Sequence, residues 1–166
     1  FEALSVRENL HVGIQRVTDE VDEEVSETLE TFGLSEKADE AAGDLSHGET
    51  QVLEIAMASS LDPKVLLLDE PVAGMSIEET ERVADMLNRL NKETDKTFVV
   101  IEHDIDFVEM ISDRVTVLNQ GHVFRQDSIE AIKNDSEVRE IYLVGAWVAR
   151  TRKRPGFVRT VTDLAP

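Results

Sequence analysis

The stretch Val65-Leu66-Leu67-Leu68-Asp69-Glu70-Pro71 decides the fold, because an uninterrupted apolar run ends there on two adjacent carboxylates. A short, continuous apolar run is typical of a strand that is buried on both faces of a parallel sheet. Open α/β sheets bind their ligands beyond the carboxyl ends of the strands. We therefore expect a buried strand over Val65–Leu68, with Asp69 and Glu70 at the edge of the sheet where ligands bind.

The rest of the chain alternates between helical patterns and apolar runs. A second buried strand is expected over Thr97–Glu102, with His103 directly after it and Asp104 as the N-cap of the next helix. The other expected elements are helices over 19–32, after Ser46 and after Ser76, a polar loop over 35–44, a hairpin of 114–118 and 122–124, and short helices over 129–133 and 137–143. Helices that alternate with strands indicate an α/β fold with a parallel core.

The composition limits the possible partners. The formal net charge of −18 argues against direct binding of nucleic acid or anionic lipid, since both require a basic surface. Acidity this high favours a cytosolic protein from a high-salt cell, and an ordinary acidic protein is the alternative. The chain has no cysteine, no apolar run long enough to span a membrane and no opening signal peptide, so we expect a soluble protein.

Leu45-Ser46-His47-Gly48-Glu49 precedes an apolar helical pattern and contains a capping box, because Ser46 is followed three residues later by Glu49. The N-terminus of a helix offers free backbone N–H groups and the positive end of the helix dipole to an anion. Ser46 adds a hydroxyl donor, and Gly48 allows the backbone to approach closely. Each motif also has a purely structural interpretation. The segment Leu45–Glu49 could be an ordinary capped helix start, Asp69 and Glu70 could be solvated acids at a strand end, and His103 could have a structural role.

Together these motifs resemble the second half of an ATP-binding-cassette (ABC) ATPase. The resemblance rests on Leu45–Glu49, on Asp69-Glu70 at a strand end, and on His103 after the next strand. It implies an incomplete α/β fold, the C-terminal part of a P-loop ABC ATPase domain, with a helical subdomain and a parallel-sheet core. The implied cofactors are ATP and Mg²⁺.

The same resemblance assigns a role to each site residue. Asp69 would hold Mg²⁺, Glu70 would act as the catalytic base, and His103 would contact the γ-phosphate and couple it to the attacking water. A further set would contact the γ-phosphate of ATP held by the opposite subunit, and therefore work only in a dimer. This set consists of Ser46, His47, Gly48 and Glu49.

The chain departs from the family pattern in several places. The family signature is usually Leu-Ser-Gly-Gly-Gln, so His47 replaces a glycine and Glu49 a glutamine; we interpret Glu49 first as capping the backbone of Ser46. The loop 71–76 resembles the family's D-loop, but Ser76 stands where many members carry aspartate. No Gly-x-x-x-x-Gly-Lys phosphate loop occurs, and none of the 8 glycines is followed by lysine.

The resemblance covers residues 1–144 and, with Phe1–Leu10 and Tyr142-Leu143, is closest to the ATP-binding subunits of branched-chain amino-acid and urea importers. We expect a mostly helical subdomain with the signature helix over 1–64 and an α/β core with C-terminal helices over 65–144. Residues 145–166 form a basic tail of unknown role. A docking tail, a linker into a further domain and read-through after a frameshift are all compatible with this segment.

The leading hypothesis is therefore a fragment of an importer's ATPase subunit, inactive alone for lack of a phosphate loop and marginally stable unless salt or a partner supports it. It would pair with a second ABC ATPase subunit, as a homodimer or heterodimer, and with membrane permease subunits at the cytoplasmic face. The alternative is a non-catalytic module that offers its signature helix to a complete ABC partner. A full reading frame upstream would favour the hypothesis of a fragment. A start codon near Phe1 would favour the hypothesis of a non-catalytic module. A DNA-repair ATPase of the SMC type is disfavoured by the acidity and by the lack of long heptad repeats.

Overall fold

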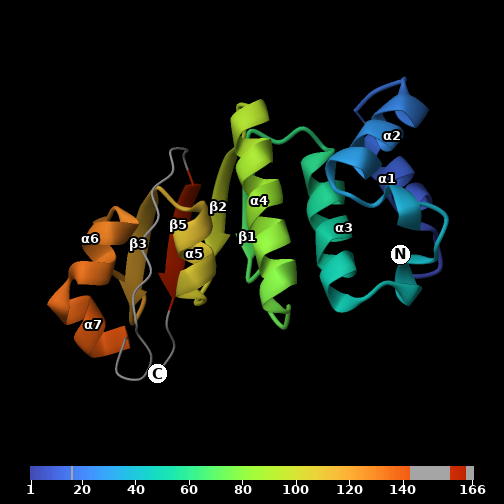
Figure 1. The fold of residues 1–166 in the computed structure, drawn as a ribbon. Helices are drawn as coiled ribbons and strands as arrows, with labels where there is room; N and C mark the ends of the chain where they lie inside the picture. Colours follow the sequence, from blue (N-terminus) through green and yellow to red (C-terminus); the bar gives the residue numbers. More distant parts are fainter. Residues whose placement is uncertain (16, 143–157, 164–166) are drawn as a thin grey trace. The chain divides into compact units, whose positions relative to one another are not determined.

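A computed structural model describes residues 1–15, 17–142 and 158–163 (Figure 1). The chain divides into two compact units. The first consists of Phe1–Leu66 with Val72–Met86, and the second of Leu67–Pro71 with Leu87–Pro166. The expected boundary at residue 64 separated a helical part from an α/β part. In the structure the division is not a single point, because Leu67–Pro71 belongs to the second unit and Val72–Met86 to the first.

The first unit is helical. It contains α1 (Val6–Ile14), α2 (Val21–Thr31), the short 3-10 turns η1 (Ser35–Lys37) and η2 (Ala42–Asp44), and α3 (His47–Ser59). Helix α1, which the sequence analysis did not predict, begins at a capping box of Ser5 and Glu8 and packs against α2 and α3. Its inward stripe of Val6, Leu10 and Ile14 is completely buried and belongs to the core.

The sheet has five strands in the order β1-β2-β5-β3-β4. The strands are β1 (Val65–Asp69), β2 (Thr97–Ile101), β3 (Arg114–Asn119), β4 (His122–Asp127) and β5 (Val158–Asp163). Strand β5 pairs in parallel with both β2 and β3, so part of the basic tail lies inside the sheet. Strands β3 and β4 form the expected hairpin, whose turn residues Gln120 and Gly121 have φ of 51° and 75°, the signs of a type I′ turn.

The expectation that β1 is buried on both faces is wrong. Leu66 and Leu68 are buried, whereas Val65 is 53% and Leu67 is 73% exposed. The physical reason is that alternate side chains of a strand point to opposite faces, and no described residue covers the face that carries Leu67. The apolar run thus shows that both faces of β1 could be buried, but the described part of the chain covers only the face that carries Leu66 and Leu68.

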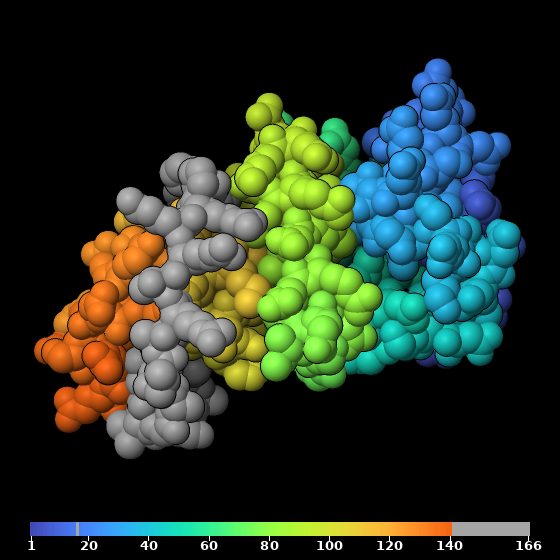
Figure 2. Space-filling view, viewed as in Figure 1, coloured from blue at the N-terminus to red at the C-terminus, as the bar shows by residue number. Residues whose placement is uncertain are grey.

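The expected helices are present with small shifts at their ends: α4 (Ile77–Glu93), α5 (Ile105–Ile111), α6 (Ile129–Asn134) and α7 (Ser136–Tyr142). The expected last helix extended to Leu143, which lies outside the described residues. Asp104 caps α5 by accepting from the backbone N–H groups of Asp106 and Phe107 at 3.0 and 3.1 Å. Figure 2 shows the solvent-facing side of α4, whose exposed positions are mostly charged. Within the described part, no helix is both long and apolar enough to cross a bilayer.

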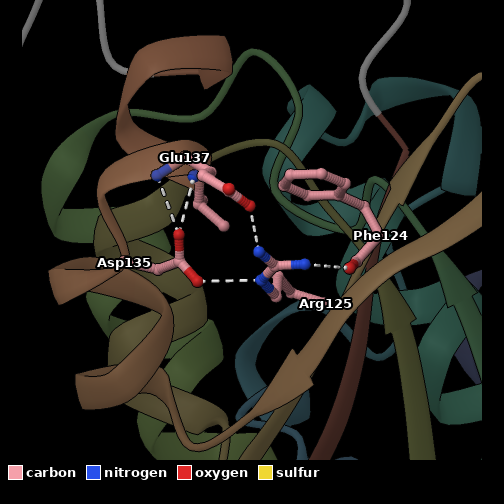
Figure 3. A network of polar contacts seen from close by, with 5 residues as sticks. Phe124, Arg125, Asp135 and Glu137 are labelled. Atoms are coloured by element: carbon pink, nitrogen blue, oxygen red, sulfur yellow. Dashed lines mark hydrogen bonds and ion pairs between the residues drawn. The ribbon is translucent and has the colours of Figure 1, made fainter.

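A polar network joins the hairpin to the two last helices (Figure 3). Arg125 on β4 donates from Nε to Asp135 Oδ2 at 2.9 Å, pairs with Glu137 and stacks over the ring of Phe124 at 4.6 Å. Asp135 in turn accepts from the backbone N–H groups of Glu137 and Val138 and so caps α7. Those backbone bonds, that of Val138 first, together with Arg125 hold the pKa of Asp135 below its ordinary value. Beside the network, β3, α5, α6 and α7 share one apolar cluster: Val108, Val115, Val117, Ile129, Ile132 and Val138.

Candidate functional site

Glu70 and His103 meet where β1 and β2 end. His103 Nδ1 lies 3.1 Å from Glu70 Oε1, and the side chains are 59% and 53% exposed. Asp69, the last residue of β1, directly precedes Glu70 and is exposed. The structure thus brings together the two residues that the sequence assigned to catalysis, on neighbouring strands of one sheet.

The backbone of Glu70 turns rather than continuing the strand. Its φ is 47°, in the left-handed region that non-glycine residues rarely adopt, and its N–H donates to the carbonyl of Ile101 at 2.9 Å. The position of the carboxylate therefore follows from this turn, because the backbone leaves the strand at Glu70. Strained backbone of this kind persists where the surrounding structure enforces it, and it is concentrated at functional sites.

Glu102 supports His103 and was missed as a site residue in the sequence analysis. Its side chain is 1% exposed, and its Oε2 accepts from the backbone N–H groups of His103 and Asp104 at 2.8 and 3.1 Å. Oε1 of Glu102 is buried without a hydrogen-bond partner among the described residues. The available signal was an acidic residue at an inward position of an apolar strand, since a carboxylate is rarely buried without a specific reason.

The two ring nitrogens of His103 have different surroundings. Nδ1 faces two carboxylates, Glu70 Oε1 at 3.1 Å and Glu102 Oε2 at 3.6 Å, whose oxygens accept hydrogen bonds when ionised. Nδ1 is therefore the ring nitrogen placed to donate to these carboxylates. Nε2 is the atom left to interact with a ligand, and Glu70 is oriented by the imidazole in the manner of a base held by a second group.

The signature segment is a capped helix start in the first unit. The Ser46 hydroxyl accepts from the Glu49 N–H at 3.3 Å, and the Glu49 carboxylate accepts from the Ser46 N–H at 2.8 Å. This confirms the capping interpretation of Glu49. The backbone N–H of Ser46, followed by its hydroxyl, holds the pKa of Glu49 below its ordinary value, with Lys37 Nζ 3.8 Å away as a smaller contribution. Ser46 is exposed, so its hydroxyl hydrogen is available to an acceptor.

Two further contacts join this segment to the loop after Glu70. His47 Nε2 lies 3.0 Å from the carbonyl oxygen of Ala73. A Cβ at Gly48 would lie 2.9 Å from Oε1 of Glu79, so only glycine fits without a shift. Glu79 itself completes a capping box with Ser76 at the start of α4, accepting from the Ser76 N–H at 2.8 Å, and the helix expected after Ser76 begins there.

A Mg²⁺ ion fits Asp69 only as part of a larger coordination shell. Mg²⁺ prefers oxygen ligands and usually takes one or two carboxylates together with phosphate oxygens and water. Asp69 is an exposed carboxylate at a strand end, which suits this chemistry. Among residues 1–15, 17–142 and 158–163, no group of three or more His, Cys, Asp or Glu could hold a metal by itself. The remaining ligands would have to come from a nucleotide and water.

Comparison with known proteins places these features in a family. The family model for the ABC transporter domain matches residues 1–73. The branched-chain amino acid transport ATP-binding protein LivG of Escherichia coli is 38% identical over 115 residues, which are 69% of this chain and 45% of LivG. BraF of Pseudomonas aeruginosa, described in the same words, is 37% identical with the same shares. A solved ATP-binding cassette of an ABC transporter has a TM-score of 0.75 at 30% identity, over 85% of this chain and 63% of that chain.

The sheet with its parallel strands β2, β5 and β3, and with a Glu–His pair where β1 and β2 end, is the partial α/β fold of an ABC-type ATPase. The chain belongs to the ABC transporter ATPase family, and its sequence is similar to those of the branched-chain amino acid transport ATP-binding proteins LivG and BraF. It spans a little under half the length of these curated relatives.

Proposed function

We propose that the chain is part of the ATP-binding subunit of an ABC importer, where it contributes to the ATP hydrolysis that energises uptake of branched-chain amino acids or urea. The observation that carries this proposal is the 3.1 Å contact between Glu70 and His103 at the carboxyl ends of neighbouring strands. The names of LivG and BraF support the amino acids, and urea rests on the resemblance of the motifs alone.

In this function Glu70 takes the proton of the attacking water, and His103 orients Glu70 through Nδ1 while Nε2 faces the γ-phosphate. Asp69 would hold Mg²⁺, which would supply neutralisation of the charge on the phosphates. Ser46 and the backbone N–H groups at the start of α3 bind the γ-phosphate of a nucleotide held by the opposite subunit. His47, Gly48 and Glu49 take part by shaping this helix start.

The chain alone should hydrolyse little ATP, because it has no phosphate loop to supply most of the donors to the phosphates. Its partners in the proposal are a second ABC ATPase subunit and the permease subunits of the importer. The permeases would hold it at the cytoplasmic face of the plasma membrane.

A chimera tests the catalytic assignment. The part of LivG that precedes its matched region is fused to this chain, and MgATP hydrolysis is measured. We expect Glu70→Gln and His103→Ala each to lower kcat at least ~100-fold with little change in KM, because each removes a group that acts on the water. Glu78→Gln on α4, which also removes one exposed carboxylate, is the control and should leave kcat unchanged. A chimera that keeps full kcat with Gln at position 70 would contradict the proposal.

The second candidate function is a non-catalytic module that offers its signature helix to a complete partner. The exposed Ser46 on a preorganised capped helix favours it, since this surface needs no phosphate loop of its own. The test mixes the chain with a complete ABC subunit whose own signature serine has been replaced by alanine. A module should restore hydrolysis, Ser46→Ala should abolish that restoration, and Glu70→Gln should not affect it.

A further inference from the structure

The loop between Glu70 and α4 contains a tight turn. The Met75 N–H donates to the carbonyl of Val72 at 3.1 Å, and Gly74, the third residue of this turn, has φ of 73°. A positive φ at the third residue with an ordinary first-to-fourth hydrogen bond is typical of a type II turn. Only Pro71 separates the turn from Glu70 in the sequence.

Such a turn has two close alternatives. Types I and II differ chiefly in the orientation of the central peptide, here the one that joins Ala73 to Gly74, and both keep the first-to-fourth hydrogen bond. Glycine at the third position permits either, because it adopts positive and negative φ with similar ease. The turn's own hydrogen bond therefore does not decide which way the carbonyl of Ala73 points.

His47 supplies the missing constraint. Its Nε2 is 3.0 Å from the carbonyl oxygen of Ala73, and a carbonyl can only accept, so Nε2 must carry the hydrogen. The ring also packs beside Gly74, where a Cβ would lie 3.5 Å from His47 Cδ2. The Nε2–H donor and the packing of the His47 ring therefore both act on the Ala73–Gly74 peptide, whose orientation the turn itself leaves open.

We propose that His47 is a positioning residue that fixes the orientation of the Ala73–Gly74 peptide, and so couples the first turn of α3 to the loop that follows Glu70. Its Nε2–H is committed to this contact, so His47 serves the site through the loop and not as a ligand of the phosphate. This inference rests on the proposed function for its role in catalysis, while the coupling itself is a property of the free chain.

The test is NMR spectroscopy of the full chain without nucleotide. Imidazole ¹⁵N spectra should show His47 with hydrogen on Nε2, and the Gly74 amide should report a single peptide orientation through its residual dipolar coupling. His47→Phe keeps a ring but removes the donor, so it should shift the ratio of the two orientations about five- to tenfold, as expected for one neutral hydrogen bond. This change should appear as new Gly74 signals or as exchange broadening.

Three further variants make the outcome specific. His47→Gln, whose amide can donate to Ala73, should restore most of the wild-type Gly74 signal. Gly74→Ala should also disfavour the wild-type orientation of the Ala73–Gly74 peptide, because alanine is strained at φ of 73°. His122→Phe on β4 is the control and should leave Gly74 unchanged.

A His47 ring with hydrogen only on Nδ1, or Gly74 signals that stay the same in His47→Phe, would overturn the inference. Because no nucleotide is present, this result is independent of the chimera. A chimera without hydrolysis, combined with a Gly74 signal that responds to His47, would remove the proposed function and leave the coupling intact.

Discussion

His103 Nδ1 lies 3.1 Å from Glu70 Oε1, and the carbonyl that anchors the Glu70 backbone belongs to Ile101, two residues before His103. One strand end therefore positions both members of the pair. The Glu70 carboxylate reaches the His103 ring because the Glu70 backbone is held in the left-handed region by its hydrogen bond to Ile101. This arrangement makes the geometry of the pair depend on strand pairing as well as on the two side chains.

The left-handed backbone at Glu70 predicts an unusual stability order. Alanine at this position keeps the strain of roughly 1–2 kcal/mol, whereas glycine relieves it and loses about 0.4–1 kcal/mol through greater freedom of the unfolded chain. We therefore expect Glu70→Gly to have a free energy of unfolding about 0.5–1 kcal/mol higher than Glu70→Ala. Urea denaturation of both variants at one KCl concentration measures the difference. Equal stabilities would mean that the backbone there is not strained.

The two faces of β1 predict opposite responses to truncation of adjacent leucines. Leu68 is 8% exposed, so Leu68→Ala should lower the free energy of unfolding by roughly 2–4 kcal/mol through lost burial and the cavity that it leaves. Leu67 is 73% exposed, so Leu67→Ala should cost less than about 0.5 kcal/mol. The same denaturation experiment compares them. A large cost at Leu67 would show that its face is covered in solution, for example by a second copy, which a repeat at tenfold lower protein concentration would reveal.

The Asp135 network predicts a pH dependence at acidic pH. The pKa of Asp135 is lowered in the folded state by the N–H groups of Val138 and Glu137 and by Arg125. Its contribution to stability is therefore complete above the ordinary aspartate pKa near 4 and is lost as pH falls through the lower folded value.

We accordingly expect Asp135→Asn to lower the thermal midpoint at pH 7, and the gap to wild type to close below about pH 4. Thermal unfolding between pH 2.5 and 7 gives both curves. Asp19→Asn, which removes the same charge from an exposed position in the other unit, should show no such gap. A gap that persists unchanged at pH 2.5 would assign the effect to something other than ionisation.

Gly48 and Glu79 should be coupled. Alanine inside a helix is favoured over glycine by up to about 1 kcal/mol, but a Cβ at Gly48 would lie 2.9 Å from the Glu79 carboxylate that caps Ser76. Gly48→Ala should therefore fail to stabilise the wild-type chain and should stabilise a Glu79→Ala chain. A double-mutant cycle in urea measures this change of sign. Additive effects would mean that the two helix starts do not touch.

Much of the local structure was predictable because its signals are local. The capping boxes at Ser46 and Ser76 and the Asn-Gln-Gly hairpin turn all lie within a few residues of the structures they specify. The presence of Glu70 and His103 in one site was also anticipated, although only through the resemblance to ABC ATPases, since the 32 residues between them carry no direct signal of proximity.

The rest depends on tertiary context that no short window contains. The exposed face of β1 could not be foreseen, because an apolar run does not reveal whether a second layer exists to cover it. The contact of His47 with Ala73 joins residues that are 26 positions apart, and the insertion of β5 between β2 and β3 is a long-range pairing of the same kind. Helix α1 is different, because its capping box at Ser5 and its stripe of Val6, Leu10 and Ile14 were visible in the sequence.

The measurement that tests the central claim most directly is a calorimetric titration of MgATP into the purified chain in molar KCl, which screens repulsion within the acidic surface. In the proposed function this chain supplies the base, its histidine and the signature helix but lacks the donors that bind most of the triphosphate. We therefore expect no binding tighter than about 1 mM, which corresponds to roughly 4 kcal/mol. Micromolar binding would contradict this expectation, because another segment would then have to take the place of the phosphate loop.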